Sequence, residues 1–165
     1  NGLSGFAAYL FYNNATVCIL VFALGFAFGV PTLLMLIYNM AMLGAMAWLF
    51  NSVGLLPDFL AWLCVHGTTE FAAILLSGAA GVHVGRNMAF PGNSSILGAT
   101  AQVGRRAALV MLGCVIMLIF AAVLEAFPRQ LAGFETRLII GIFMGLVWLS
   151  LFVLVGRKPS DGDPA

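Results

Sequence analysis

Residues 107–127 read AALVMLGCVIMLIFAAVLEAF, an apolar run in which Glu125 is the one charged residue. As an α-helix, this stretch would be about 31 Å long, which matches the thickness of the hydrocarbon core of a bilayer. On the surface of a soluble protein, such a segment would expose a long stretch of apolar side chains to water. The run therefore predicts a helix that crosses a membrane, with one carboxyl group inside it.

The whole chain has the same apolar character. Of its 165 residues, 62% are hydrophobic and 8% are charged, whereas charged residues make up about a quarter of a typical soluble domain. The apolar runs are continuous and lack the alternation of barrel strands. We therefore predict an all-α integral membrane protein, a bundle of four or five transmembrane helices in which the lipid bilayer is the solvent. The net charge of +1 argues against binding to nucleic acid.

The remaining spans are expected at residues 15–37, 59–84 and 138–155. Residues 40–50 form an apolar segment of about 17 Å, which is too short for a normal crossing. We therefore expect a broken or re-entrant helix pair near the N-terminus, with a kink or break close to Pro31 and an interruption at Tyr38 and Asn39.

One domain accounts for nearly the whole chain. Residues 1–156 are expected to form a single transmembrane domain, and residues 157–165 a polar, disordered tail. The connection at 86–106 is expected to end in a short interfacial helix at 95–106. Basic residues favour a cytoplasmic side for this connection and the tail, which hold Arg86, Arg105, Arg106, Arg157 and Lys158, against Arg129 and Arg137 on the other side.

His66 and Glu70 are the most informative polar residues, because they lie inside an apolar run and on one face of a helix. Glu125 ends its own span at a similar depth, so the three side chains are predicted to form one cluster. Three interpretations remain open: a hydrogen-bonded network that fixes helix packing, a proton or ion site of a small transporter or channel, and a metal-dependent hydrolase. No cofactor is expected, although His66 and Glu70 are candidate metal ligands that Glu125 would complete, since a catalytic zinc usually has three protein ligands.

Glycines recur at a spacing of four residues in separate apolar segments. Such pairs allow helix backbones to approach closely in lipid. They predict a tightly packed bundle or the seam of a homodimer, with packing inside one chain favoured. The pairs are Gly25 with Gly29, Gly81 with Gly85, preceded by Gly78, and Gly141 with Gly145.

The order of several short motifs resembles the stage II sporulation protein M family. The most specific is the block His66-Gly67-x-x-Glu70 in its membrane setting. Other matching features are Asn13-Asn14, Gly25 and Gly29, Tyr38-Asn39, Gly44, Ala72-Ala73, Gly78, Gly81, Gly85, Pro91-Gly92, Arg105-Arg106 and Glu125-Ala-Phe.

This resemblance implies a multi-span protein of the bacterial or archaeal plasma membrane. The sporulation member of the family belongs to a membrane complex with cell-wall hydrolases that remodels septal peptidoglycan. The leading hypothesis is therefore a non-enzymatic scaffold that self-associates, as a dimer, and binds other membrane or envelope proteins. The hydrolase and the transporter or channel are the alternatives.

Overall fold

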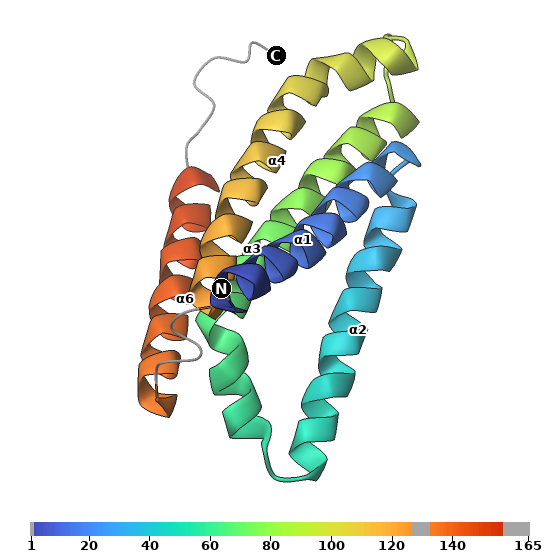
Figure 1. Ribbon diagram of the computed structural model, residues 1–165. Helices are drawn as coiled ribbons and strands as arrows, with labels where there is room; N and C mark the ends of the chain where they lie inside the picture. Colours follow the sequence, from blue (N-terminus) through green and yellow to red (C-terminus); the bar gives the residue numbers. More distant parts are fainter. Residues whose placement is uncertain (1, 127–132, 157–165) are drawn as a thin grey trace.

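The computed structural model describes residues 2–126 and 133–156, which form five α-helices and one short 3-10 helix (Figure 1). Each α-helix is long and apolar enough to cross a membrane, which confirms the predicted all-α membrane fold. The predicted tail at 157–165 lies outside the described residues. The elements are α1 (Gly2–Ala23), η1 (Leu24–Phe26), α2 (Val30–Ser52), α3 (Leu56–Ala89), α4 (Ile96–Ala126) and α6 (Phe134–Gly156).

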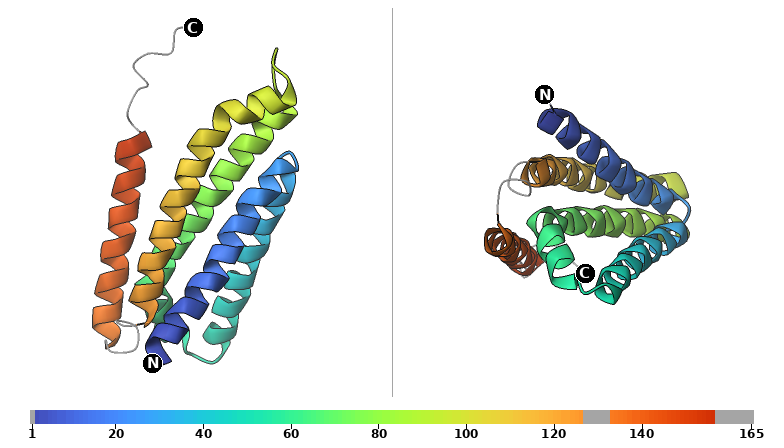
Figure 2. Two further views of the ribbon diagram at one scale, coloured as in Figure 1. Left: turned by 45° about the horizontal axis from the view of Figure 1, so that its top comes forward. Right: turned by 60° about the horizontal axis from the view of Figure 1, so that its bottom comes forward.

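Helix α3 is the centre of the bundle. It touches α1, α2, α4 and α6, and its largest interface is with α4. Figure 2 shows α1 and α4 on one side of α3, with α2 and α6 flanking it. The core between α1, α3 and α4 includes Cys18, Ala73 and Leu118, each at most 1% exposed. The other helices thus take their positions from α3.

The first two helices do not begin and end where the sequence suggested. The predicted span at 15–37 is wrong, because α1 ends at Ala23 and a turn separates it from α2. Gly29 takes a left-handed conformation (φ 80°) in this turn. The predicted break near Pro31 is confirmed. Pro31 itself lies in the first turn of α2, where no helical partner for its missing N–H is needed, so it starts the second helix.

Helix α2 is also longer than expected. The prediction that residues 40–50 form a re-entrant segment is wrong, because they belong to a continuous helix of 23 residues. Tyr38 and Asn39 do not interrupt it. The side-chain amide of Asn39 donates to the Met35 carbonyl one turn earlier, at 2.8 Å, and so remains compatible with the helix.

The turn between α1 and α2 packs against the glycine-rich half of α3. A Cβ atom on Gly25 would overlap the backbone of Gly81. A Cβ atom on Gly85 would likewise overlap the backbone of Gly25 and Gly29. These two predicted pairs therefore allow a close approach within one chain, between a turn and a helix.

The other predicted packing glycines differ in how close an added Cβ atom would come to neighbouring residues. A Cβ on Gly141 of α6 would lie 2.5 Å from the Cβ of Cys64, so these backbones are also close. A Cβ on Gly78 would lie 2.8 Å from the Leu36 side chain of α2. At Gly145 it would be in ordinary contact with Thr68, at 3.7 Å. Every one of these contacts lies inside the chain.

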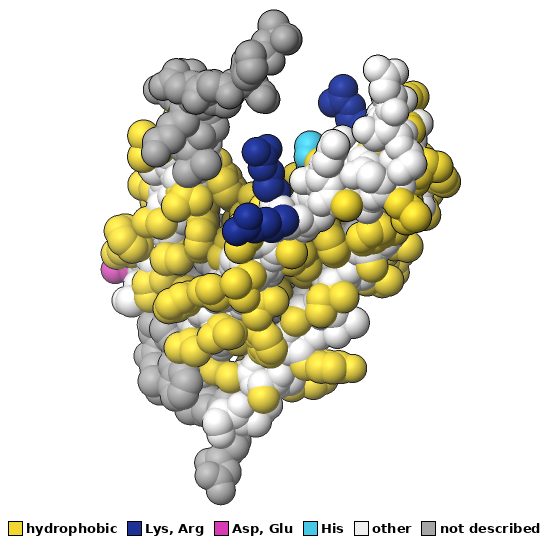
Figure 3. Space-filling view, turned by 90° about the horizontal axis from the view of Figure 1, so that it is seen from above, with side chains coloured by type: hydrophobic (Ala, Val, Ile, Leu, Met, Phe, Trp, Pro, Cys, Tyr) yellow, Lys and Arg dark blue, Asp and Glu magenta, His cyan; other side chains and the backbone are white. Residues whose placement is uncertain are grey.

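Residues 95–106 do not form the separate interfacial helix that was predicted, because α4 runs without interruption from Ile96 to Ala126. The predicted cytoplasmic anchor Arg86 lies in the last turn of α3, and Arg105 and Arg106 lie in the first half of α4. Figure 3 shows basic side chains bordered by hydrophobic ones on this face of the molecule. The α1–α2 turn lies at the same end of the bundle as the last turn of α3 (Figure 1). With α2 crossing fully, α1 begins at the opposite end of the bundle.

Candidate functional site

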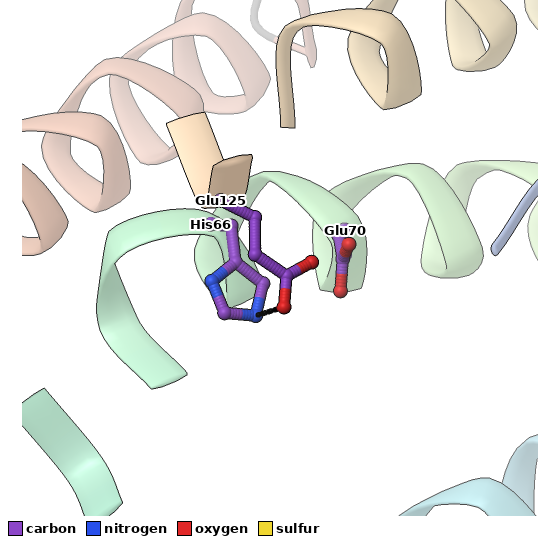
Figure 4. Close-up of side chains that lie close together, drawn as sticks. All are labelled: His66, Glu70 and Glu125. Carbon is purple, nitrogen blue, oxygen red and sulfur yellow. Dashed lines mark ion pairs between the residues drawn. The ribbon is translucent and has the colours of Figure 1, made fainter. Parts of the chain in front are cut away.

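The structure brings His66, Glu70 and Glu125 together between α3 and α4 (Figure 4). The Nε2 atom of His66 lies 3.5 Å from Oε1 of Glu125. One potential ligand atom from each residue lies within 4.8 Å of the others. His66 and Glu125 are 3% and 4% exposed, and Glu70 is partly buried. The cluster is therefore a compact group inside the bundle.

The helix geometry explains why these three residues meet. His66 and Glu70 are four residues apart in α3 and so share a face. Helix α4 returns antiparallel beside α3, which places Glu125, near the end of α4, opposite the first half of α3 (Figure 1). The Cys114 thiol, which contacts the Ala73 carbonyl at 3.4 Å, holds the two helices together nearby.

Asn14 of α1 is a fourth member of the cluster that the sequence analysis missed. Its side-chain amide donates a hydrogen bond to Oε1 of Glu70. The preceding residue, Asn13, is exposed. The signal was an amide inside the apolar segment 2–23, but a span assumed to begin at residue 15 left Asn14 outside the membrane. The carboxyl group of Glu70 thereby connects α3 to α1.

An aromatic series borders the cluster on the side of the α2–α3 turn. The rings of Trp62 and His66 meet edge to face, with their centroids 5.5 Å apart. Phe59 stacks between Trp62 and Phe50 of α2. Beyond Trp62 lies a cavity of about 320 Å³, lined by Met46, Phe50, Leu55, Asp58, Phe59, Trp62 and Arg137. Trp62 therefore contacts the imidazole of His66 and also contributes to the lining of this cavity.

A second polar contact, also missed in the sequence, connects α3 to α6. The indole N–H of Trp148 donates to the hydroxyl of Thr69, at 3.0 Å. Thr69 is fully buried and is next to Glu70 in the chain. Polar side chains at residues 66–70 of α3 thus reach α1, α4 and α6.

The other predicted polar residues lie elsewhere. Tyr38 of α2 is 58% exposed on the outside of the bundle. His83 and Arg86 line a separate pocket at the opposite end of α3, and the helical spacing of 17 residues from His66 also places His83 on a different face of the helix. Neither group contributes to the cluster.

Two kinds of chemistry suit a buried imidazole beside two carboxyl groups. The groups can share protons through hydrogen bonds, which would lock the helices in place. They also provide one nitrogen and two oxygen donors, a set of three that resembles the protein ligands of catalytic zinc ions. The hydrolase alternative would use the second property, with water at a fourth position.

Fold and site together define a multi-pass helical membrane protein with a polar cluster inside the bundle. The family model described as stage II sporulation protein M matches residues 1–128, and the chain belongs to this family. No curated protein and no solved structure matches it.

Proposed function

We propose that this chain is a non-catalytic scaffold of the bacterial or archaeal plasma membrane, which associates with a second copy of itself and recruits other envelope proteins. The observation that carries this proposal is the difference between α3 and α2 in how much of each helix is buried by the rest of the chain. Helix α3 directs its polar and glycine contacts to the other helices of the chain, whereas α2 has Thr32 as its one buried residue. Helix α3 thus holds the bundle together, while the surface of α2 remains available to partners.

The outward surface of α2 has the features of a helix-packing face. Tyr38, Ala41, Ala45 and Trp48 follow one another at spacings of three and four residues and are all exposed, and Gly44 lies beside them with no atom near its Cβ position. Small residues permit close contact between helices. A partner helix can also accept a hydrogen bond from the Tyr38 hydroxyl, which lipid hydrocarbon cannot do. We call these five residues the α2 face.

Membership of the stage II sporulation protein M family supports the envelope setting. The cluster supports a structural role, because Asn14 already bonds to Glu70 and His66 lies against Glu125. Under this proposal, removing a cluster side chain weakens the bundle and its assembly together. An enzyme would instead keep its assembly and lose turnover.

The oligomeric state in lipid nanodiscs tests the α2 face. We expect the unmodified chain to be a dimer and Gly44→Leu to shift it towards monomer. Gly113→Leu is the matched control, because the Cβ position of Gly113 on α4 is also open. A chain that is monomeric without any substitution, or two variants that dimerise equally well, would contradict the proposed interface.

His66→Ala tests the structural role of the cluster. The scaffold hypothesis predicts a lower unfolding midpoint and less dimer than in the unmodified chain. Dimerisation and stability that remain unchanged, together with loss of an envelope-remodelling activity in cells, would sink it in favour of a catalytic role.

A further inference from the structure

We propose that His66, Glu70 and Glu125 bind one divalent transition-metal cation of the zinc class, which joins α3 to α4 inside the bundle. This site is independent of the α2 face. A structural ion would stabilise the scaffold without requiring any turnover, so its failure would leave the proposed function intact.

The separation of the donor atoms fits a shared ion. Two ligands bound to a tetrahedral zinc at about 2.1 Å lie about 3.4 Å from each other. The His66 nitrogen and the Glu125 oxygen are 3.5 Å apart, which is well beyond the usual length of a hydrogen bond between nitrogen and oxygen, about 2.9 Å. Glu70 offers a carboxyl oxygen that lies within 4.8 Å of one potential ligand atom of His66 and one of Glu125, close enough for all three residues to belong to one coordination sphere after adjustment of their side chains.

The charge balance favours a dication. Two carboxylates at close range in a medium of low dielectric repel each other strongly. Helix α1 carries no Lys or Arg, and neither do residues 59–85 of α3 or 107–126 of α4. Arg137 of α6 lines the neighbouring cavity together with Asp58 and Trp62, and none of the three cluster residues lines it. An ion of charge +2 bound to both carboxylates would offset their negative charges within the cluster.

Surrounding groups would hold the ligands in position. The Asn14 amide donates to Glu70, and the Trp62 ring fixes one edge of the imidazole of His66. Hydrogen bonds to ligating carboxylates and fixed imidazole orientations are common around protein metal sites. Asn14 is therefore a positioning residue, which acts through Glu70.

The donor types select the metal. One imidazole and two carboxylates are too few oxygen ligands for calcium, which takes six to eight. Imidazole with carboxylate suits zinc and related ions of the first transition row. We therefore assign the site to zinc or to a transition metal of similar size, with Co²⁺ as a spectroscopic substitute.

The test uses the full chain, purified in detergent, stripped with a chelator and then equilibrated with Zn²⁺. We expect about one bound ion per chain by elemental analysis and a higher unfolding temperature than in the stripped protein, since a ligand of the folded state stabilises it. Co²⁺ should give visible absorption bands of tetrahedral strength.

Variants separate this site from adventitious metal binding. Glu125→Gln and His66→Ala should each lose most of the bound ion and the thermal shift, while Glu135→Gln, on the exposed start of α6, should keep both. Asn14→Ala should weaken Zn²⁺ binding by about 10-fold to 100-fold, as expected when a ligand loses its supporting hydrogen bond. Circular dichroism verifies that the variants are folded.

Three results would overturn the proposal. The first is a folded, unmodified chain that binds no Zn²⁺ after equilibration. The second is equal metal content in the unmodified chain and in Glu125→Gln and His66→Ala, which would place the ion elsewhere. The third is bound Zn²⁺ that leaves the unfolding temperature unchanged.

Discussion

The two halves of α3 are held by opposite means. At one end, Gly81 and Gly85 meet the turn between α1 and α2 through backbone contacts, with no room for a Cβ atom on Gly25 or Gly85. We call this the glycine end. At the other, residues 66–70 reach neighbouring helices through polar side chains, and we call this the polar end. Shape determines the contacts of the first end, and polar side chains determine those of the second, so the two ends should respond differently to substitution.

The largest effect is expected at the glycine end. Gly85→Ala should lower the free energy of unfolding by about 3 kcal/mol, because the added methyl group meets backbone atoms that cannot rotate away. Gly85→Leu should leave no folded protein. Unfolding by denaturing detergent, followed by circular dichroism, measures both.

The control for this prediction is Gly113→Ala, whose Cβ position in α4 is open. It should be neutral or stabilise the protein by up to about 1 kcal/mol, as expected for alanine in a helix. A loss of the same size at both sites would show that the glycine end is not tightly packed.

At the polar end, Glu125→Ala should cost about 2 kcal/mol of stability, because it leaves His66 buried without this partner. The same unfolding titration measures it. Glu135→Ala, at an exposed position, should change stability by less than about 0.5 kcal/mol. If the two substitutions lowered stability equally, the contact between His66 and Glu125 would make no specific contribution to the stability of the bundle.

Adjacent asparagines offer a sharper comparison within the polar end. Asn14→Leu should cost about 1–2 kcal/mol, because Glu70 loses its amide donor. Asn13→Leu changes an exposed residue of the same type and should have little effect in lipid. Thermal unfolding in nanodiscs distinguishes them, and a reversed order would contradict the assignment of Asn14 to the cluster.

The smallest effect is expected for the contact with α6. Trp148→Phe keeps most of the ring and removes the hydrogen bond to Thr69, so it should cost about 1 kcal/mol. Phe143→Leu, at a residue of α6 that is 62% exposed, is the control. Tryptophan fluorescence during unfolding measures the stability of each variant. Equal stabilities would show that the hydrogen bond between Trp148 and Thr69 does not contribute to the stability of the polar end.

The sequence was informative about the solvent and about the residues of the site. The apolar run at 107–127 and the scarcity of charge were enough to predict helices in a membrane. His66, Glu70 and Glu125 were predicted to meet because helical spacing and the direction of each span place them at similar depths. Both inferences depend on the local spacing of residues along a helix, which can be read directly from a single sequence.

The sequence was less informative about boundaries and partners. The break near Pro31 was placed inside a single span that began at residue 15, although proline also starts helices, and that choice displaced α1 and hid Asn14 from the cluster. The Gly25 and Gly29 pair predicted close packing, but spacing alone could not show that they belong to a turn seated on Gly81 and Gly85. Such contacts depend on which distant segments meet.

The central claim is that the polar end holds α3 to α4 through His66 and Glu125. A double-mutant cycle with His66→Ala and Glu125→Ala tests it most directly, because it isolates the energy that depends on both residues. We predict that the unfolding free energies are non-additive by about 1–3 kcal/mol, with the double variant hardly less stable than either single one. Additive losses would show that the two side chains stabilise the bundle independently, and would contradict the account.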